Sequence, residues 1–431
     1  MAKIEPRTLK GFRDFLPEEQ IVRQKFIDTV RASFEAFGFE PLETPALEYA
    51  DILVGKYGDE GDKLMYRFKD NGDRDVALRY DLTIPLARVA AQYGDLKKPW
   101  KRYQISPVWR ADNTQKGRFR EFYQSDADIV GTSEPTADAE VLALSAFTLR
   151  KLGVSDFIIR VNSREILKGF YGALGLGEGT QVSVMRTIDK IDKIGQEKVR
   201  GELAGLCIPE SDIDAIIEFS AVRVSDFKEL LDLRKKFKGI DEAVLKLSII
   251  IDRALTLDPD LNWVADFSIA RGLDYYTGLI FETNLTKAPQ YGSVLSGGRY
   301  DNLIGMFSNR AVPAVGASVG LDRLLAALEE LKVIEPQKSV AKALVVNFDE
   351  KYTPKYLWVA SELRRAGINT LLYFDAADLK KQLSYADTKG IQYALIYGEN
   401  EAKEKAIVVK DLKKGSQEKV ALADLVAYLS K

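Results

Sequence analysis

The chain has 431 residues, of which 46% are hydrophobic and 29% are charged, and this composition is typical of a globular protein with two or three domains. Its 62 basic and 64 acidic side chains give a net charge of −2, so any contact with nucleic acid must come from local basic patches. Histidine is absent, which excludes Ser-His-Asp catalysis and histidine-based metal sites, and the single cysteine, Cys207, excludes an internal disulfide.

The sequence contains neither a secretory pattern nor a membrane-spanning pattern. Residues 1–19 lack an apolar core of the secretory type. No stretch approaches the roughly 18 uninterrupted apolar residues that a spanning helix requires. We therefore expect a cytoplasmic protein without membrane contact, and a lone cysteine suits such a reducing compartment.

The N-terminal part predicts a helix followed by a strand. Apolar residues recur at helical spacing through residues 18–37, and Gly38 is typical of a helix end. Residues 39–44 then have the pattern of a strand, which Pro45 stops. Taken alone, this segment is equally compatible with an ordinary helix–strand unit.

Two hairpins are predicted next along the chain. The turn sequence Asn-Gly-Asp at residues 71–73 divides short alternating runs within residues 65–79. Residues 103–110 and 119–130 form a second pair of strands, which the polar loop 111–118 joins. Strands connected in this way build an antiparallel sheet rather than a Rossmann fold.

The middle of the chain changes character twice. Residues 170–245 carry many charged side chains at helical spacing and predict a helical insertion. Its glycines precede no βαβ pattern and are interpreted as a loop, not a dinucleotide site: Gly172, Gly175, Gly177 and Gly179. Strand patterns resume at Trp263 and continue through Val294.

One block in this region is unusual for its charge. Residues 271–276 read Arg-Gly-Leu-Asp-Tyr-Tyr inside the apolar stretch 267–281, which predicts a strand, a close turn and a returning strand. Charged groups there are costly unless they have partners. A structural Arg–Asp pair would explain the block taken alone. However, residues 78–83, 108–128 and 297–301 have the same character.

The C-terminal part predicts a separate α/β domain. Residues 316–331 are interpreted as a glycine-rich turn into a helix at 322–331, and residues 332–339 as a linker. Strands and helices then alternate, as in an α/β module. The predicted strands are 343–347, 370–374, 391–397 and 406–409, and the predicted helices are 354–366, 377–387 and 422–429.

The chemistry of the chain rests on arginines, acids and tyrosines. The sequence has no G-x-x-x-x-G-K-[ST] loop for a nucleotide. Arginines can hold a triphosphate instead, because their guanidinium groups are permanently charged, bidentate donors. Arg110 ends a predicted strand, and Arg118 and Arg120 follow across the loop. Arg323 lies at the start of a predicted helix.

Together these segments resemble the histidyl-tRNA synthetase family of class II aminoacyl-tRNA synthetases. Residues 109–122 match class II motif 2, and Gly320-Leu321-Asp322-Arg323 matches motif 3. The resemblance implies an α+β fold, in which helices flank a class II antiparallel sheet and a helical insertion and a C-terminal α/β anticodon-binding domain follow. The implied parts are a catalytic domain at residues 1–331 with its insertion at about 170–245, a linker at 332–339 and an anticodon-binding domain at 340–431.

The resemblance also implies an activity. A histidine:tRNA ligase of this family activates histidine with ATP, accompanied by Mg²⁺, and then transfers histidyl to the 3′ end of tRNA(His). It would be a homodimer, because the helix and strand of residues 18–44 resemble motif 1, which builds the family's interface. Two alternatives stay open at this point. One is a regulatory subunit of ATP phosphoribosyltransferase, which lacks the C-terminal domain, and the other is a ligase that works without tRNA. Arg271 and residues 343–431 favour the synthetase over the regulator.

The contacts with ATP follow from the resemblance, residue by residue. Arg110 would hold the α-phosphate, and Arg118 and Arg323 would hold the outer phosphates. Phe122 would stack on adenine, and Asp112 is the acid of motif 2. The loop residues that would meet the acceptor end of the tRNA are Asn113, Gln115 and Lys116.

The amino-acid site is implied in the same way. Asp81 would pair with the substrate α-ammonium group, Thr83 would accept a hydrogen bond, and Gln124 would contact the substrate backbone. Asp128 lies on the same strand face as Gln124, since side chains alternate along a strand. By resemblance it would accept the imidazole Nδ1 proton.

The charged block at residues 271–276 completes the implied site. Arg271 would bridge the substrate carboxylate and the α-phosphate and stabilise charge that develops on phosphorus. Tyr276 would address the second ring nitrogen, with Tyr275 beside it, and Arg299 receives no role. Because the chain has no histidine, an inflection of kcat/KM near roughly pH 6–6.5 is predicted to come from the free substrate.

Overall fold

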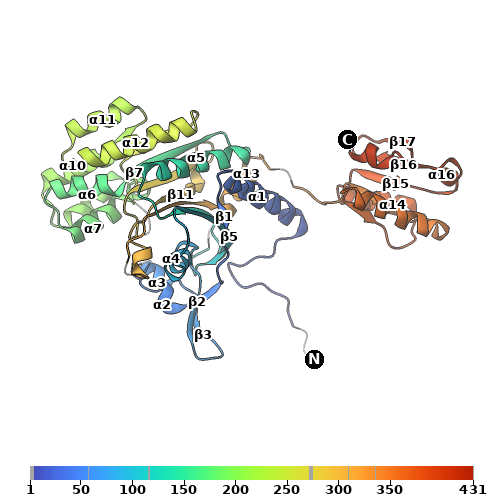
Figure 1. Cartoon of the computed structure of the whole chain (residues 1–431), viewed down its shortest axis with the longest axis horizontal. Helices are drawn as coiled ribbons and strands as arrows, with labels where there is room; N and C mark the ends of the chain where they lie inside the picture. Colours follow the sequence, from blue (N-terminus) through green and yellow to red (C-terminus); the bar gives the residue numbers. More distant parts are fainter. Residues whose placement is uncertain are drawn as a thin grey trace. The chain divides into compact units, whose positions relative to one another are not determined.

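The computed structural model describes residues 4–430 apart from residues 57, 115–116, 271–274, 309 and 335. Their contacts divide the chain into two compact units, which we treat separately (Figure 1). The large unit comprises Met1–Arg13 and Phe26–Val333, and the small unit comprises Asp14–Lys25 and Ile334–Lys431. None of the helices in the described part of the chain is long and apolar enough to cross a membrane.

A nine-stranded sheet forms the centre of the large unit. Its order is β1-β5-β6-β12-β11-β10-β7-β9-β8, and all neighbours are antiparallel except the pairs β1/β5 and β7/β9. The strands are β1 (Glu40–Pro41), β5 (Trp100–Trp109), β6 (Glu121–Val130), β7 (Phe157–Ser163), β8 (Arg223–Val224), β9 (Trp263–Asp266), β10 (Leu279–Leu285), β11 (Ser293–Arg299) and β12 (Ala314–Gly320). The predicted antiparallel sheet is therefore confirmed.

Helices cover one face of this sheet. α5 (Pro135–Lys151) and α13 (Leu321–Glu330) pack against β6, β11 and β12 (Figure 1). On the other face, β6 carries polar side chains, and the start of α4 (Thr83–Gln92) meets β5 there, where Arg102 donates to the carbonyl of Leu82. A three-stranded sheet lies next in the chain order: β2 (Leu47–Tyr49), β3 (Arg67–Lys69) and β4 (Asp75–Leu78), with the short helices α2 (Ala50–Leu53) and α3 (Gly58–Lys63) between β2 and β3.

The predicted N-terminal helix is confirmed as α1 (Pro17–Ala36). Its apolar positions Val30 and Phe34 are buried, and Gly38 follows with a φ of +76°. The predicted strand at residues 39–44 is shortened to β1 (Glu40–Pro41). The reason is that Thr44 and its neighbour Glu43 leave the ladder to bond with side chains of β5.

Both predicted hairpins are confirmed. β3 and β4 pair around a turn in which Asp73 has a φ of +58°. β5 and β6 pair along their whole length, from Trp100 opposite Val130 to Trp109 opposite Glu121. The long second hairpin matters for function, because its polar loop and the inner face of β6 border the cavity described below.

The helical region is also confirmed, and its helices run from Arg164 to Leu257, beyond both ends of the 170–245 segment. Its helices are α6 (Arg164–Ala173), α7 (Glu178–Ile188), α8 (Ile191–Ile194), α9 (Gln196–Ala204), α10 (Glu210–Ser220), α11 (Phe227–Lys236) and α12 (Asp241–Leu257). Phe170 stacks on Phe219 with ring centroids 3.9 Å apart. Gly172 and Gly179 lie within helices rather than a loop, and β8, which joins the main sheet, was not predicted.

One predicted strand and one predicted turn were wrong. The chain at 267–270 is not a strand, because Asp266 ends β9 by accepting hydrogen bonds from the backbone and hydroxyl of Ser268 at 3.0 and 2.8 Å. Residues 316–320 belong to strand β12, not to a turn. Gly316 is needed there, since a Cβ at this position would lie 1.9 Å from Oδ1 of Asp128.

The small unit is an α/β module, as predicted. Its five-stranded sheet has the order β14-β13-β15-β16-β17, parallel at the first two pairs and antiparallel after them. The strands are β13 (Ala343–Val345), β14 (Thr370–Leu372), β15 (Tyr393–Ile396), β16 (Ala406–Asp411) and β17 (Ser416–Ala421), and the helices are α14 (Thr353–Arg365), α15 (Leu379–Thr388), α16 (Glu399–Glu404) and α17 (Leu425–Ser430). β17 and α16 were not predicted, because their polar sequences lack periodic apolar residues.

Candidate functional site

A cavity of about 470 Å³ opens on the sheet face opposite α5 and α13. It gathers residues that the sequence places far apart, from the start of α4, the second hairpin, β10 to β12 and the start of α13. The sequence-predicted residues that line it are Asp81, Thr83, Arg110, Asp112, Arg118, Phe122, Gln124, Tyr275, Tyr276 and Arg323. The cavity therefore has an arginine-rich part and an acid- and tyrosine-rich part.

Arg110 lies at the end of β5, between two aromatic rings. Its guanidinium carbon is 4.4 Å from the ring centroid of Tyr80 and 5.1 Å from that of Phe122. Its Nε donates to the carbonyl of Tyr80 at 3.0 Å, which fixes the plane of the guanidinium group. The remaining donors give this wall a fixed positive charge beside an aromatic ring on which a flat base can stack.

The other two predicted arginines are also held by the protein. Arg118 donates to Oδ2 of Asp112 at 3.0 and 2.7 Å, although half of its side chain is exposed. Arg323 donates to the carbonyl of Ser293 at 2.7 Å. Both side chains are thus oriented toward one cavity, where a polyanion would find bidentate donors.

The acid of motif 3 organises the rim of the cavity. Asp322 accepts a hydrogen bond from the backbone N–H of Tyr123 at 2.8 Å, and it forms an ion pair with Arg13 at 2.6 Å. Arg13 also lies 3.4 Å from the ring centroid of Phe119. No sequence pattern points to Arg13, which is a single arginine near the N-terminus.

Opposite the arginines, the start of α4 presents polar groups. Oδ1 of Asp81 accepts from the backbone N–H of Ile84 at 3.0 Å, in the manner of a helix cap. Gln124 donates to the hydroxyl of Ser318 at 3.1 Å. The amide oxygen of Gln124 is buried and has no hydrogen-bond partner in the described part of the chain.

Two tyrosines close the acidic part. The rings of Tyr275 and Tyr276 have centroids 5.1 Å apart, and Tyr275 shares a hydrogen bond with Thr83. Burial raises the pKa of both hydroxyls well above their usual range, so both are neutral donors near pH 7. Gly298 makes room for them, since a Cβ there would lie 2.9 Å from the ring of Tyr276.

Asp128 lies beneath this part and does not line the cavity. Its Oδ1 accepts a hydrogen bond from Tyr300. Its Oδ2 lies 2.8 Å from a guanidinium nitrogen of Arg102 and forms an ion pair with it, but the angles of this contact do not fit a hydrogen bond. Burial raises its pKa, which Arg102 and Tyr300 oppose. Its predicted role as acceptor for the imidazole stays a prediction.

Several residues of the site were missed in the sequence. Arg102 is completely buried between Asp128 and the start of α4, and Asp126 is buried between Gln124 and Asp128 on the same face of β6. Glu282 of β10 lines the cavity. The alternation Gln124, Asp126, Asp128 was visible as a signal, whereas the position of Arg102 depends on the register of β5 against β6.

Three predicted residues lie outside the described residues: Arg271, Gln115 and Lys116. Along the chain, Ile269 and Tyr275 are the described residues on either side of Arg271 that border the cavity. Asn113 is exposed in the loop of the second hairpin.

Arg299, which had no predicted role, is a support behind the site. It donates to Asp138 of α5 at 2.9 Å, and both side chains are almost completely buried. Its carbonyl accepts from the backbone N–H of Thr277 at 2.7 Å. The pair thus joins α5 to the segment that carries Tyr275 and Tyr276.

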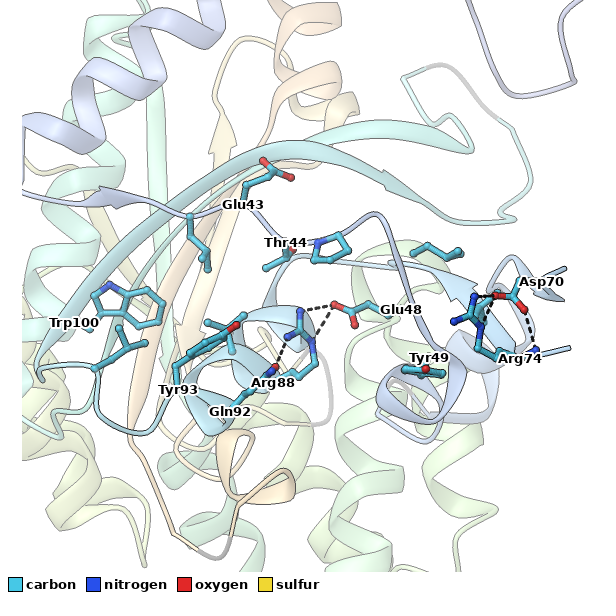
Figure 2. Close-up of a pocket in the computed structure, with 16 residues that line it drawn as sticks. Glu43, Thr44, Glu48, Tyr49, Asp70, Arg74, Arg88, Gln92, Tyr93 and Trp100 are labelled. Atoms are coloured by element: carbon cyan, nitrogen blue, oxygen red, sulfur yellow. Dashed lines mark hydrogen bonds and ion pairs between the residues drawn. The ribbon is translucent and has the colours of Figure 1, made fainter. Parts of the chain in front are cut away.

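A second, larger cavity of about 800 Å³ lies on the large unit (Figure 2). Its walls are mostly apolar, and they include Leu47, Tyr49 and Tyr93, which are 40%, 56% and 57% exposed. Arg88 pairs with Glu48 at 2.7 Å inside it (Figure 2). This groove contains none of the predicted site residues.

Two family models together cover most of the chain. The model described as "Histidyl-tRNA synthetase" matches residues 11–324, and the model described as "Anticodon binding domain" matches residues 342–431. The chain belongs to the histidyl-tRNA synthetase family. A curated histidine–tRNA ligase from Rhodopirellula baltica is 44% identical to it over an alignment 428 positions long, which covers 97% of this chain and 96% of that protein.

Solved structures agree with the family. The crystal structure of histidyl-tRNA synthetase from Nostoc sp. PCC 7120 has a TM-score of 0.91 and 34% identity, and the match covers 99% of each chain. An ATP phosphoribosyltransferase regulatory subunit/histidyl-tRNA synthetase from Bacillus halodurans C has a TM-score of 0.75 and 21% identity, over 89% of this chain and 97% of that one. The second likeness shows a shared fold only. The class II fold expected for a histidyl-tRNA synthetase is confirmed.

Proposed function

We propose that this chain is a histidine–tRNA ligase that uses ATP. The observation that carries the proposal is the single cavity in which Arg110, Arg118 and Arg323 face a part lined by Asp81, Gln124 and two tyrosines. A polyphosphate and a zwitterionic amino acid fit these two halves side by side. The full-length similarity to curated histidine–tRNA ligases supports the same conclusion.

The first step needs positioning rather than a protein base. The histidine carboxylate is already ionised at neutral pH, and its oxygen attacks the α-phosphorus of ATP. The bond from phosphorus to the bridging oxygen of pyrophosphate breaks, which leaves histidyl-adenylate. Arg110, and by resemblance Arg271, would stabilise the charge that develops on the α-phosphate. The absence of histidine from the chain is therefore no obstacle to catalysis.

The second step transfers histidyl to the terminal adenosine of tRNA(His). The ribose hydroxyl attacks the carbonyl carbon, AMP leaves, and we propose that a phosphate oxygen of the adenylate takes the hydroxyl proton. The exposed loop that contains Asn113 would receive the acceptor end. The α/β module at residues 340–431 would bind the anticodon, which the match of residues 342–431 supports.

The remaining site residues take the roles that the family implies. Asp81 would hold the substrate α-ammonium group, with Thr83 beside it and Gln124 on the substrate backbone. Arg118, oriented by Asp112, and Arg323 would hold the outer phosphates, and the adenine would stack on Phe122. The imidazole would lie over the part that Tyr275, Tyr276 and the buried Asp128 form.

Mg²⁺ would accompany ATP. This ion keeps most of its waters and usually takes one or two carboxylates together with substrate phosphates. The described residues contain no cluster of three acids or cysteines that could hold a metal by themselves. Glu282 in the cavity wall fits the role of a single carboxylate ligand. The ion would neutralise the part of the phosphate charge that the arginines do not neutralise.

The regulatory alternative is weaker for this chain. A regulator of the ATP phosphoribosyltransferase type resembles the catalytic core, and the structure from Bacillus halodurans C shares the fold at 21% identity. Residues 342–431 match an anticodon-binding domain, which such a regulator would not need. A ligase that works without tRNA would not need it either.

We also propose that the protein is a cytoplasmic homodimer whose interface covers the 800 Å³ groove. The groove adjoins the end of β1, where the resemblance places motif 1, and it exposes Tyr49 and Tyr93 (Figure 2). The ion pair between Arg88 and Glu48 adds no net charge to the groove, which suits contact with an apolar partner surface. Sedimentation should give the mass of two chains at micromolar concentration, and a monomer that charges tRNA would contradict this interface.

One experiment tests activity and domain roles together. ATP–pyrophosphate exchange is measured with each of the twenty amino acids, and tRNA charging follows, for the full chain and for residues 1–335. We expect exchange with histidine alone, and we expect the shortened protein to lose far more charging than exchange. A full chain without histidine-dependent exchange would refute the proposed function. A folded, soluble 1–335 protein that is inactive in exchange would refute the division of roles.

A further inference from the structure

The inner face of β6 carries a row of three polar side chains, of which Asp126 is the middle one. Gln124 and Asp128 flank it, and Ser318 of β12 and Gln104 of β5 lie opposite it in the ladder. Gln124 and Ser318 line the substrate cavity, whereas Asp126 is 2% exposed and lies directly beneath them. Asp126 therefore belongs to the floor of the cavity.

The carboxyl group of Asp126 is poorly compensated. It has a hydrogen bond with Ser318, but its Oδ1 is buried and lacks a hydrogen-bond partner among the described residues. The nearby cation, Arg102, is engaged by Asp128 at 2.8 Å and by the carbonyl of Leu82. A buried carboxylate without its own cation favours the protonated form.

The charged groups around Asp126 act in the same direction. Asp128 on its own strand and Asp81 before α4 are acids, and among the described residues Arg102 on β5 is the cation that opposes them. Burial is the largest cause and Asp128 the next, and together they raise the pKa of Asp126 to about 7. Tyr275 and Tyr276, which face it from the loop before β10, stay neutral because burial raises the pKa of their hydroxyls. Asp126 can thus change its charge near neutral pH.

We propose that Asp126 is a specificity-determining residue of this cavity, and that it gives its proton to solvent when an amino acid with an α-ammonium group and a ring N–H donor binds. The inference rests on the proposed function and adds a residue to it. A cation or N–H donor that arrives in the cavity favours the carboxylate and lowers the pKa of Asp126. An amino acid with an apolar side chain brings the α-ammonium group but no ring donor, so it lowers the pKa of Asp126 less and binds less tightly.

Proton release has a definite sign. Binding must tighten as the pH rises toward the pKa of the empty enzyme, by up to about tenfold per pH unit below it, and must level off above it. The inflection near pH 6–6.5 that is expected from free histidine stays a prediction, and the proposal adds Asp126 as a second titrating group, because burial and Asp128 raise its pKa to about 7. The two are separable with a ring-fluorinated histidine, whose imidazole pKa is far lower.

The test is calorimetric binding of ring-fluorinated histidine to the full-length protein in buffers of different ionisation enthalpy. Wild type should release about half a proton per ligand at pH 7, and Asp126→Asn should release none. The ratio of the variant's Kd to the wild-type Kd should fall about tenfold between pH 8 and pH 6, because the wild-type acid is protonated at pH 6. The matched control is Ser125→Ala, whose side chain lies on the opposite face of β6, and it should behave as wild type.

Each other outcome contradicts the inference. Equal loss of affinity at pH 6 and pH 8 would make Asp126 merely structural, and unchanged proton release in Asp126→Asn would place the titrating group elsewhere. If that variant does not fold, Ser318→Ala gives the answer. The hydrogen bond from Ser318 lowers the pKa of Asp126, so its loss should move the inflection in the pH dependence of Kd to higher pH. An inflection that does not move would contradict the assignment of the titrating group to Asp126. Failure of the wild type to bind or activate histidine would instead refute the proposed function.

Discussion

Replacing Arg102 with methionine should lower the free energy of unfolding of the large unit by about 3–5 kcal/mol. Arg102 and Asp128 form an ion pair in which 0% and 4% of the side chains are exposed, so the change leaves a buried carboxylate without its cation. Asp126 loses the same cation. The loss should also weaken histidine binding, because the floor of the cavity would have to rearrange around two uncompensated acids.

The size of this defect should depend on pH. Arg102 lowers the pKa of both acids, so without it their folded-state pKa values rise further above the unfolded value of about 3.9. An acid whose pKa is raised by folding destabilises the folded state once the pH exceeds the unfolded pKa. Arg102→Met should therefore lose more stability at about pH 8 than at about pH 5.

Thermal and urea unfolding at the two pH values measure the effect. Arg67→Met is the matched control, since Arg67 pairs with Asp75 on the exposed β3–β4 hairpin and such surface pairs contribute little. Its unfolding transition should stay close to that of wild type at both pH values. A similar small loss for Arg102→Met would mean that water or a rearranged side chain compensates the buried acids.

The sequence predicted the fold where local chemistry determines it. The Asn-Gly-Asp turn of the first hairpin and the apolar spacing of α1 are local signals, and both elements are present. Gly316 misled the prediction because a glycine in a strand looks like a turn. Glycine is required at this position because a Cβ would lie 1.9 Å from the side chain of Asp128, which is 188 residues away in the chain (316 − 128).

The site shows the same limit. Motif spacing placed Arg110, Arg118 and Arg323, and the structure brings them into one cavity. Arg102 and Asp126 form no motif in the sequence. Their importance arises because β5 and β12 set the groups beside Asp126, one of whose oxygens has no hydrogen-bond partner among the described residues. Cross-strand register and burial decide this, and neither can be derived from spacing along one strand.

The second large effect is expected for Arg271→Lys, which should reduce kcat for adenylate formation by about 100-fold or more, or on the order of 3–4 kcal/mol in the barrier. Lysine keeps the positive charge but loses the planar fork that can contact the substrate carboxylate and the α-phosphate together. Charge accumulates on the phosphoryl oxygens in the transition state, so the loss should fall on kcat more than on KM. The role comes from the family resemblance, and Ile269 and Tyr275, on either side of Arg271 in the chain, both border the cavity.

Single-turnover formation of histidyl-adenylate measures this step without product release. Arg365→Lys is the control for the exchange of arginine for lysine, because Arg365 is 75% exposed on α14 and pairs only with the nearby Glu362 among the contacts described for it. The control should retain wild-type rates. Unchanged kcat in Arg271→Lys would refute the catalytic role. A raised KM for histidine with normal kcat would instead show that Arg271 holds the carboxylate equally in the ground and transition states, and Arg110 would then be the arginine that stabilises the α-phosphate.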